Sequence, residues 1–212
     1  MIKPFVIAID GPAASGKGTL ARNLAVHYAL DHVDTGLTYR AVAHYMLIDN
    51  IALTNEDAAI SIAQKLDLAK LDMECLSSHI LGEAASEIAV LPGLRQILST
   101  IHRQRAEKPP GTVLDGRDVG TVIFPDADVK FYMIADVRNR ANRRYHQITT
   151  MGSNAVYNDI LTSIKRRDER DTNRMEGSLR RAKDAFLLDT TKLSTMEVFE
   201  EACQFIRRKR II

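Results

Sequence analysis

The 212-residue chain carries 29 lysines and arginines against 27 aspartates and glutamates, and its net charge of +2 argues against general nucleic-acid or membrane-surface binding. Its 45% hydrophobic and 26% charged residues are ordinary for one soluble globular domain, and no apolar run is long enough for a signal peptide or a membrane span. Two distant cysteines, Cys75 and Cys203, and six scattered histidines lack metal-ligand spacing, so we expect a cytoplasmic monomer with reduced thiols, no dedicated metal centre and no nucleic-acid or membrane partner.

Apolar runs alternate with helical patterns along the chain. Strands are predicted at Phe5–Ile9, Thr112–Leu114, Val129–Ile134 and Ala185–Leu188. Helices are predicted at about Lys17–Leu30, Thr38–Asn50, Glu56–Leu66, Leu81–Val90, Leu94–Ala106, Val137–Thr149, Val156–Asp171 and Thr195–Lys209. The last helix carries a capping-box signature, Ser194 and Glu197. Because the strands are apolar on both sides, we predict an α/β fold in which helices flank a parallel β-sheet.

Two segments interrupt this alternation. Residues 53–106 are nearly all helical, whereas residues 149–181 are dense in charge. Inserted segments in α/β proteins often act as lids over the ligand crevice at the carboxyl ends of the strands. We therefore predict a single domain, residues 1–212, with a core at 1–52, 107–148 and 182–212, a helical insert at 53–106 and a charged lid at 149–181.

The most informative stretch is the glycine-rich run Gly11-Pro-Ala-Ala-Ser-Gly-Lys-Gly-Thr19, between the first predicted strand and the first predicted helix. The backbone N–H groups of such a loop, the helix N-terminus and the Lys17 ammonium together make a cradle for phosphate groups. We expect the whole run to bind a nucleotide polyphosphate: Gly11, Pro12, Ala13, Ala14, Ser15, Gly16, Lys17, Gly18 and Thr19. Gly18 stands where the general P-loop pattern has serine or threonine. This variant looks like the loop of nucleoside monophosphate kinases, in which the metal is held largely through water and phosphate.

A second stretch, Val113-Leu-Asp-Gly-Arg-Asp-Val-Gly-Thr121, places charged residues at the end of a predicted strand. Asp115 would lie at the crevice edge, where a carboxylate can organise Mg²⁺ and its waters beside a P-loop. Gly116 is expected to leave space for a ligand, and Arg117 and Asp118 would present opposite charges there. The alternative interpretation is a solvated turn with a simple Arg–Asp pair.

A third stretch, Val33-Asp-Thr-Gly-Leu-Thr-Tyr-Arg40, combines a short extended segment, a glycine turn and an arginine at the start of a helix. Arg40 could receive a substrate phosphate, although a surface loop fits this pattern at least as well.

A fourth stretch is the charged run Lys165–Asp171 with the arginine that follows it. One helix face would carry Arg167, Arg170, Asp171 and Arg174. Arg170 and Arg174 would repel each other unless an anion lay between them, and the alternative is a solvated helix. Next to a P-loop, the pattern favours an arginine lid that clamps phosphates and excludes water. Whether Arg140, Arg143 and Arg144 face solvent or phosphate stays open at this point.

Together these stretches resemble the bacterial type of cytidylate kinase, and the resemblance covers essentially the whole chain. Its most specific signature is Leu114-Asp-Gly-Arg-Asp-Val-Gly-Thr-Val-Ile-Phe-Pro-Asp126, which separates this family from adenylate, guanylate and thymidylate kinases. Other matching segments are Asp34–Arg40, Ala85–Ser86, Pro92–Arg95, Arg103–Arg105 and Arg167–Arg174. The resemblance implies a P-loop kinase fold and transfer of the γ-phosphoryl group of ATP, with Mg²⁺, to CMP and dCMP.

The resemblance also implies roles for individual residues. The catalytic groups would be Lys17, Arg117, Arg167 and Arg174, with Lys17 spanning the ATP phosphates and Asp115 holding Mg²⁺ through water. The acceptor phosphate would be bound by Arg40, Arg117 and Arg174, the cytosine by Ser86, Arg95 and Asp118, and the sugar by Arg167 and Asp171. Two features depart from the family: Thr35 replaces a frequent serine in the acceptor site, and the segment between Leu66 and Ser86 is shorter than in many members, which implies a trimmed acceptor-binding insert.

Two alternative functions use the same phosphate loop. The first is a kinase for another nucleoside monophosphate or for a small metabolite. The second is a GTPase-like switch, which the sequence opposes because it contains no Asp-x-x-Gly segment and no Asn-Lys-x-Asp motif. A nucleic-acid-binding role would rest on the arginine clusters alone.

Overall fold

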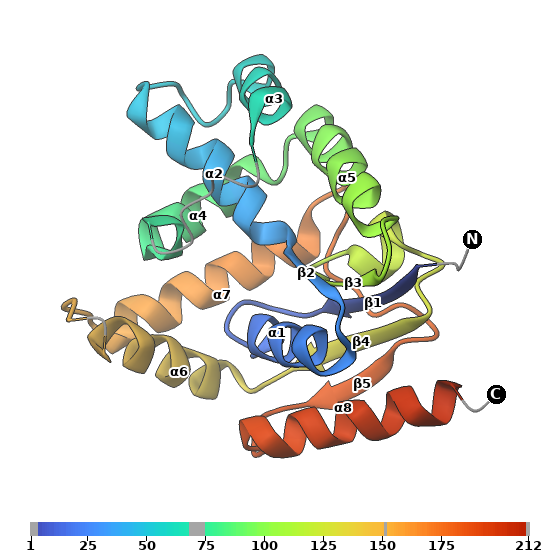
Figure 1. Ribbon diagram of the computed structural model, residues 1–212. Helices are drawn as coiled ribbons and strands as arrows, with labels where there is room; N and C mark the ends of the chain where they lie inside the picture. Colours follow the sequence, from blue (N-terminus) through green and yellow to red (C-terminus); the bar gives the residue numbers. More distant parts are fainter. Residues whose placement is uncertain (1–3, 68–74, 151, 211–212) are drawn as a thin grey trace.

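Five parallel β-strands form the centre of the computed structural model, which describes residues 4–67, 75–150 and 152–210. The strands are β1 (Phe5–Asp10), β2 (Asp31–Asp34), β3 (Gly111–Gly116), β4 (Val129–Ile134) and β5 (Phe186–Asp189). They lie in the order β2-β3-β1-β4-β5, so β1, which leads into the glycine-rich loop, is the central strand (Figure 1). The predicted α/β class, a parallel sheet flanked by helices, is confirmed.

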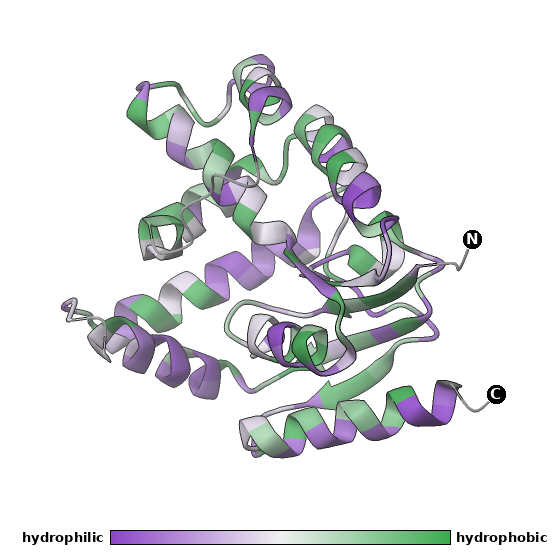
Figure 2. Ribbon diagram, in the orientation of Figure 1, coloured by the Kyte–Doolittle hydropathy of each residue, from purple (hydrophilic) through white to green (hydrophobic). Residues whose placement is uncertain are grey.

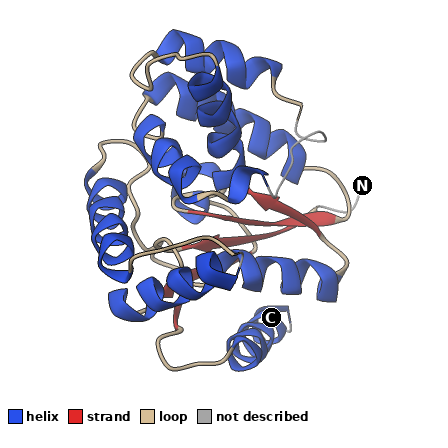
Figure 3. Cartoon of the chain, turned by 90° about the vertical axis from the view of Figure 1, so that its left-hand side faces the viewer, coloured by secondary structure: helices blue, strands red, loops and turns tan. Residues whose placement is uncertain are grey.

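The sheet is buried because helices cover both of its faces, as Figure 3 shows with the strands in red between blue helices. Every residue of β1 after Phe5 is buried. Helices α1 (Lys17–Tyr28) and α8 (Thr195–Arg210) pack on one face in a cluster that includes Ile9, Leu24, Phe131 and Ile206. The cluster on the other face includes Ala8, Ala106, Leu114 and Ile123. Figure 2 shows the same pattern as mostly hydrophobic strands and helices striped with hydrophilic residues.

Four helices form the predicted insert and its support at the top of Figure 1: α2 (Thr35–Ile48), α3 (Glu56–Lys65), α4 (His79–Ile88) and α5 (Pro92–Ala106). They share a hydrophobic cluster of their own, which includes Met46, Ile88, Leu94 and Leu98. Helices α6 (Val137–Thr150) and α7 (Tyr157–Asn173) pack against each other through Ala141, Ile160 and Ile164. Helix α7 also contacts α4, so it joins the sheet side of the molecule to the insert.

One local prediction was wrong and one element was not predicted. The short extended segment expected before Gly36 is confirmed as the end of β2, but the expected glycine turn is instead the first turn of α2, with Gly36 inside the helix. The helix begins early because the Asp34 carboxylate caps it by accepting a hydrogen bond from the Leu37 N–H at 3.1 Å. The residues Val119–Ile123, for which no helix was predicted, form one π-helical turn, η3. The N–H groups of Val119 and Gly120 donate to the buried Asp10 carboxylate at 2.8 Å each.

The proposed division into core, insert and lid stays a prediction. Residues 68–74, within the short segment between Leu66 and Ser86, lie outside the described residues. The rest of that segment contains η2, a 3₁₀ turn at Cys75–Ser77, and most of α4. None of the helices in the described ranges is long and apolar enough to cross a membrane.

Candidate active site

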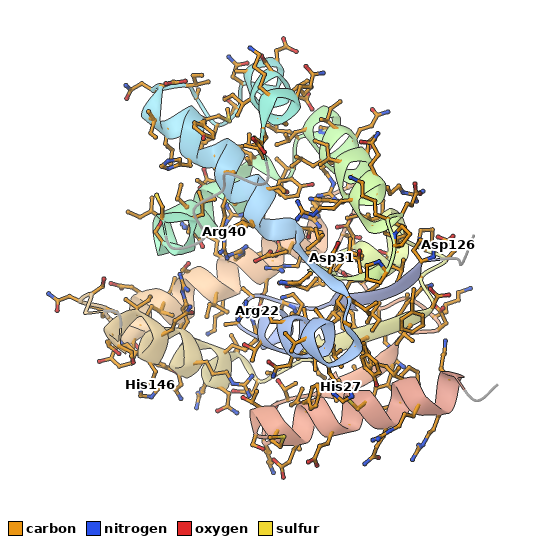
Figure 4. The ribbon with its side chains drawn as sticks, viewed as in Figure 1. Arg22, His27, Asp31, Arg40, Asp126 and His146 are labelled. Atoms are coloured by element: carbon orange, nitrogen blue, oxygen red, sulfur yellow. The ribbon has the colours of Figure 1, made fainter. Side chains whose placement is uncertain are left out.

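A cavity of about 640 Å³ lies at the carboxyl ends of the central strands, where α/β sheets usually bind their ligands. Its lining includes nearly all the residues predicted from the sequence: Ala13, Ala14, Ser15, Gly16, Lys17, Gly18, Thr19, Thr35, Arg40, Ser86, Arg95, Asp115, Arg117, Asp118, Arg167, Asp171 and Arg174. Gly11 and Pro12 are not part of the lining. Figure 4 labels two of the lining cations, Arg22 on α1 and Arg40 on α2.

The loop Gly11–Thr19, here called the phosphate loop, wraps the N-terminus of α1. Gly16 caps the helix in a left-handed conformation, with φ 96°, which a residue with a side chain rarely adopts. A Cβ at Gly11 would clash with the Met133 carbonyl oxygen, so only glycine lets the loop pack against β4. The helix therefore presents its first N–H groups and its positive dipole end to the cavity.

Lys17 is buried at the start of α1, and its Nζ donates to the Pro12 carbonyl oxygen at 2.9 Å. Burial lowers the pKa of Lys17 to about 7, with a further contribution from the positive charge of Arg117. A buried ammonium of this kind favours a negatively charged ligand, because the negative charge of the ligand would compensate for the water that the ammonium has lost.

Asp115 is the last residue but one of β3, and it lies beside the phosphate loop. Its Oδ1 lies 2.8 Å from His32 Nε2, and its Oδ2 faces Gly18, 3.8 Å from the position that a Cβ would take there. Among the described residues, no three His, Cys, Asp or Glu side chains gather in a way that could hold a metal ion.

Gly116 lines the cavity, as its expected place beside a ligand requires, but protein atoms fill the position of its missing side chain. A Cβ at Gly116 would clash with Thr35 Oγ1 and would lie 2.8 Å from Val119 Cγ2, so protein atoms already fill this space. The Thr35 hydroxyl donates to the Asp115 carbonyl oxygen at 2.8 Å. Thr35 thereby ties the start of α2 to the end of β3.

Arg95 and Asp118 form a buried ion pair at the other end of the cavity, with 2.5 Å between Arg95 Nη2 and Asp118 Oδ2. Arg95 Nη1 also donates to the Ala89 carbonyl oxygen at 3.1 Å, which fixes the guanidinium plane. Arg174 Nη2 lies 3.7 Å from the second oxygen of Asp118. Donors and an acceptor thus lie side by side, an arrangement that can form hydrogen bonds with a polar heterocycle.

Several arginines line the middle of the cavity around one buried carboxylate. Asp171 Oδ2 accepts from Arg117 Nε at 2.7 Å and lies 3.9 Å from Arg167 Nε. Burial opposes ionisation of Asp171, but Arg117 and Arg167 outweigh it and hold the carboxyl pKa below its usual value. Burial and Arg117 lower the pKa of Arg167 to about 10. The Nε–H groups of Arg40 and Arg167 are buried without a hydrogen-bond partner in the described part of the chain, so they have donors to offer an anion.

Comparison with known proteins assigns the chain to a family. A family model described as cytidylate kinase matches residues 7–208. The chain is 55% identical over 205 residues to a cytidylate kinase of Bartonella tribocorum, covering 97% of this chain and 95% of the relative. It is 48% identical over 206 residues to a cytidylate kinase of Brucella suis, covering 97% and 94%. The chain belongs to the cytidylate kinase family. It is accordingly a phosphotransferase of the nucleoside monophosphate kinase type, as the sequence resemblance implied.

Solved structures agree at the level of the fold. A gluconokinase from Sinorhizobium meliloti matches with a TM-score of 0.55 at 11% identity, covering 98% of this chain and 94% of that one. An uncharacterised protein from Eubacterium ventriosum matches with a TM-score of 0.56 at 14% identity, covering 96% and 98%. These similarities support the P-loop kinase fold of this cytidylate kinase family member and nothing finer.

The structure separates Arg170 from the other arginines of α7. The sequence had grouped it with Arg174 around a shared anion, and this expectation was wrong. Arg170 turns to α4, where its Nη2 lies 3.0 Å from Glu83 Oε2 and its Nη1 lies 3.6 Å from Glu87 Oε1. The charge pattern of α7 alone could not reveal these acidic partners, because they come from another helix.

Two arginines of α6 support the phosphate loop in this family member, a role that the sequence left open. Arg140 is buried, donates from Nη1 to the Ala13 carbonyl oxygen at 3.1 Å and lies 2.6 Å from Asp168 of α7. Arg143 Nη1 donates to Thr190 Oγ1 at 3.0 Å, and Thr190 Oγ1 donates to the Ser15 carbonyl oxygen at 3.0 Å. Arg144 lines the cavity. The sequence did not indicate a role for Thr190, because this residue follows a short strand and belongs to no motif.

Proposed function

We propose that this protein transfers the γ-phosphoryl group of ATP to CMP, and to dCMP, in one direct in-line step. The observation that carries the proposal is that a single cavity joins the phosphate loop to the Arg95–Asp118 pair, with Arg40, Arg117 and Arg167 along the same lining. We propose further that residues 53–106 are the acceptor-binding insert and residues 149–181 the lid of one kinase domain.

The phosphate loop would hold ATP through its backbone N–H groups, with the Lys17 ammonium bridging the phosphates. The residues present also suit Mg²⁺ held partly by water and phosphate, because Asp115 Oδ2 faces the loop while no complete protein ligand set lies among the described residues. Mg²⁺ would neutralise phosphate charge during transfer, and Asp115 would orient its water shell.

Asp118 and Arg95 would read the cytosine. The Asp118 carboxylate can accept a hydrogen bond from the exocyclic amine, and the Arg95 guanidinium can donate to the ring nitrogen and the carbonyl oxygen. Uracil would set a carbonyl oxygen against the Asp118 carboxylate, leaving two buried acceptors unpaired, which is the kind of mismatch that gives strong discrimination. Ser86, whose hydroxyl lies 3.4 Å from Asp171 Oδ1, would complete the base site.

Arg40, Arg117 and Arg174 would bind the acceptor phosphate, while Arg167 and Asp171 would contact the sugar and close the lid. Cations on the equatorial oxygens stabilise the charge of the transferring phosphoryl group, and the positioned acceptor oxygen needs no covalent enzyme intermediate. Exclusion of water by the lid would keep ATP from simple hydrolysis.

Product identification with γ-labelled ATP and CMP tests the proposal. The expected result is label in CDP in proportion to the ADP formed. Label that accumulates only as inorganic phosphate, with no CDP, would overturn it.

A further inference from the structure

Helices α4 and α7 meet through a polar contact at the wall of the cavity, which Glu83 and Ser163 help to line. None of the proposed catalytic roles uses this contact. Glu83 of α4 lies at its centre. Glu83 Oε1 accepts from Ser163 Oγ at 2.7 Å, while Glu83 Oε2 accepts from Arg170 Nη2 at 3.0 Å and Arg166 Nη2 at 3.3 Å. Glu87 adds the 3.6 Å ion pair with Arg170. We call this set, Glu83, Glu87, Ser163, Arg166 and Arg170, the α4–α7 clasp.

The clasp is more than a surface ion pair. The Glu83 side chain is only 17% exposed and the Arg170 side chain 21%, so water screens this pair less than an exposed one. Burial opposes the charge of Glu83, but the hydrogen bonds from Ser163 and from the two arginines prevail and lower its carboxyl pKa. The carboxylate therefore stays charged at neutral pH with donors on both oxygens.

The two arginines of the clasp, Arg166 and Arg170, alternate along α7 with residues that line the cavity. Arg167 directly follows Arg166, and Asp171 directly follows Arg170. On α4, a Cβ at Gly82 would lie 3.3 Å from Arg167 Nη1, so the two helices approach closely at this point. Because a helix is rigid over two turns, a contact that fixes Ser163 and Arg170 against α4 also fixes Arg167 and Asp171 in the cavity.

We propose that Glu83 is a positioning residue for the acceptor: by gripping α7, it holds Arg167 and Asp171 of the lid opposite Ser86 of the insert. Both carboxylate oxygens of Glu83 already accept hydrogen bonds from α7, so we assign it the placing of α7 rather than direct binding of the substrate, although it helps to line the cavity. This inference rests on the proposed function for its kinetic consequence, because the grip matters for catalysis only if those side chains bind the acceptor nucleotide.

Glu83→Gln tests the role, since glutamine keeps the side-chain shape and can accept from Ser163 but loses both ion pairs. The matched control is Glu169→Gln, which removes the same charge from the exposed side of α7. We expect Glu83→Gln to raise the KM for CMP about tenfold, within the range for losing charged hydrogen bonds, with a smaller change in kcat and an unchanged KM for ATP. A KM for CMP within twofold of the parent, or an equal rise in Glu169→Gln, would overturn the proposal.

Two further measurements separate the clasp from the proposed function. In a double-mutant cycle, Glu83→Gln and Arg170→Gln should have non-additive effects on the KM for CMP, because both substitutions remove the same Glu83–Arg170 interaction. Additive effects would contradict the clasp. Amide hydrogen exchange of the nucleotide-free protein needs no activity. We expect faster exchange in α7 of Glu83→Gln than in the parent and the control, with an unchanged sheet, and equal exchange in α7 would overturn the proposal. If the parent transferred phosphate to no cytidine nucleotide, the proposed function would fail. The exchange test would still show whether Glu83 holds α7 against α4.

Discussion

Lys17 places its amino group inside the protein, with 6% of the residue exposed. The glycine-rich pattern around it predicted a phosphate-binding role, and the structure supplies the physical reason for such a role. Burial brings the pKa of Lys17 down to about 7, whereas a bound polyphosphate would favour the charged form strongly. Lys17 therefore lowers the free energy of unfolding of the empty protein, and a bound anion would restore it.

Lys17→Met tests this view of the residue. We expect kcat/KM for phosphoryl transfer to fall about 100-fold or more, as when a preorganised donor is lost from a transition state. The midpoint of thermal unfolding should stay unchanged or rise, because a buried charge is removed. Initial rates and circular dichroism melts measure both effects, with Lys65→Met at the exposed end of α3 as the control. Near-normal turnover in Lys17→Met would refute the assignment.

His102 is a buried polar residue that no motif indicated. It is fully buried on α5, and its Nε2 lies 2.9 Å from Thr38 Oγ1. Since the Thr38 hydroxyl already donates to the Thr35 carbonyl oxygen at 2.8 Å, His102 Nε2 must be the donor to Thr38. Burial, aided by the charge of Arg95, lowers the pKa of His102 to about 4.

The low pKa of His102 predicts an acid-sensitive contribution to stability. An unfolded histidine titrates near pH 6.5, so between pH 6.5 and pH 4 the unfolded state binds more protons and the free energy of unfolding falls as the pH falls. The advantage of the parent over His102→Gln should shrink by about 3 kcal/mol between pH 7 and pH 4. Urea denaturation of both proteins across this range measures it, and titrations common to both cancel. A difference that did not change with pH would show that His102 is not held neutral.

At the scale of elements, local signals predicted some structures and missed others for identifiable reasons. The first strand, the phosphate loop and α1 follow one another in sequence, so the local pattern was sufficient to predict all three. The capping box of α8 is confirmed, with the Ser194 N–H donating to Glu197 Oε2 at 2.8 Å. Strand β2 was missed as a strand because Asp31-His-Val-Asp34 is short and polar, and its pairing with β3 is a distant contact.

Arg140 joins three elements, since it bonds to the phosphate loop and to Asp168 of α7 from its place on α6. We expect Asp168→Ala to lower the free energy of unfolding by about 3 kcal/mol, because it leaves a buried guanidinium without its carboxylate. Urea denaturation at pH 7 measures the loss. Glu169→Ala, which removes the neighbouring exposed carboxylate, should change stability by under about 0.5 kcal/mol. Equal effects of the two substitutions would mean that the Arg140–Asp168 pair does not contribute to the free energy of unfolding.

At the scale of the whole molecule, the site forms where segments distant in the chain come together. Nearly all the residues that the sequence singled out line one cavity, while their roles stay a prediction. The sequence could not predict how they pair. Arg95 bonds Asp118 from another element, Arg170 turns away to α4, and Thr35 packs against Gly116 where a side chain would lie. Such pairings depend on how elements pack, which a local pattern does not record.

In the proposed function, this cavity brings the phosphates of ATP next to a cytidine monophosphate. The most direct test is the rate of ADP formation from ATP with CMP, dCMP, AMP, UMP, GMP or dTMP supplied separately, compared as kcat/KM. We expect CMP and dCMP to stimulate ADP formation by at least about 100-fold over the other four, because the other bases leave buried polar groups at Arg95 and Asp118 unpaired. If CMP stimulated ADP formation no more than AMP, UMP, GMP or dTMP, the proposed function would be contradicted.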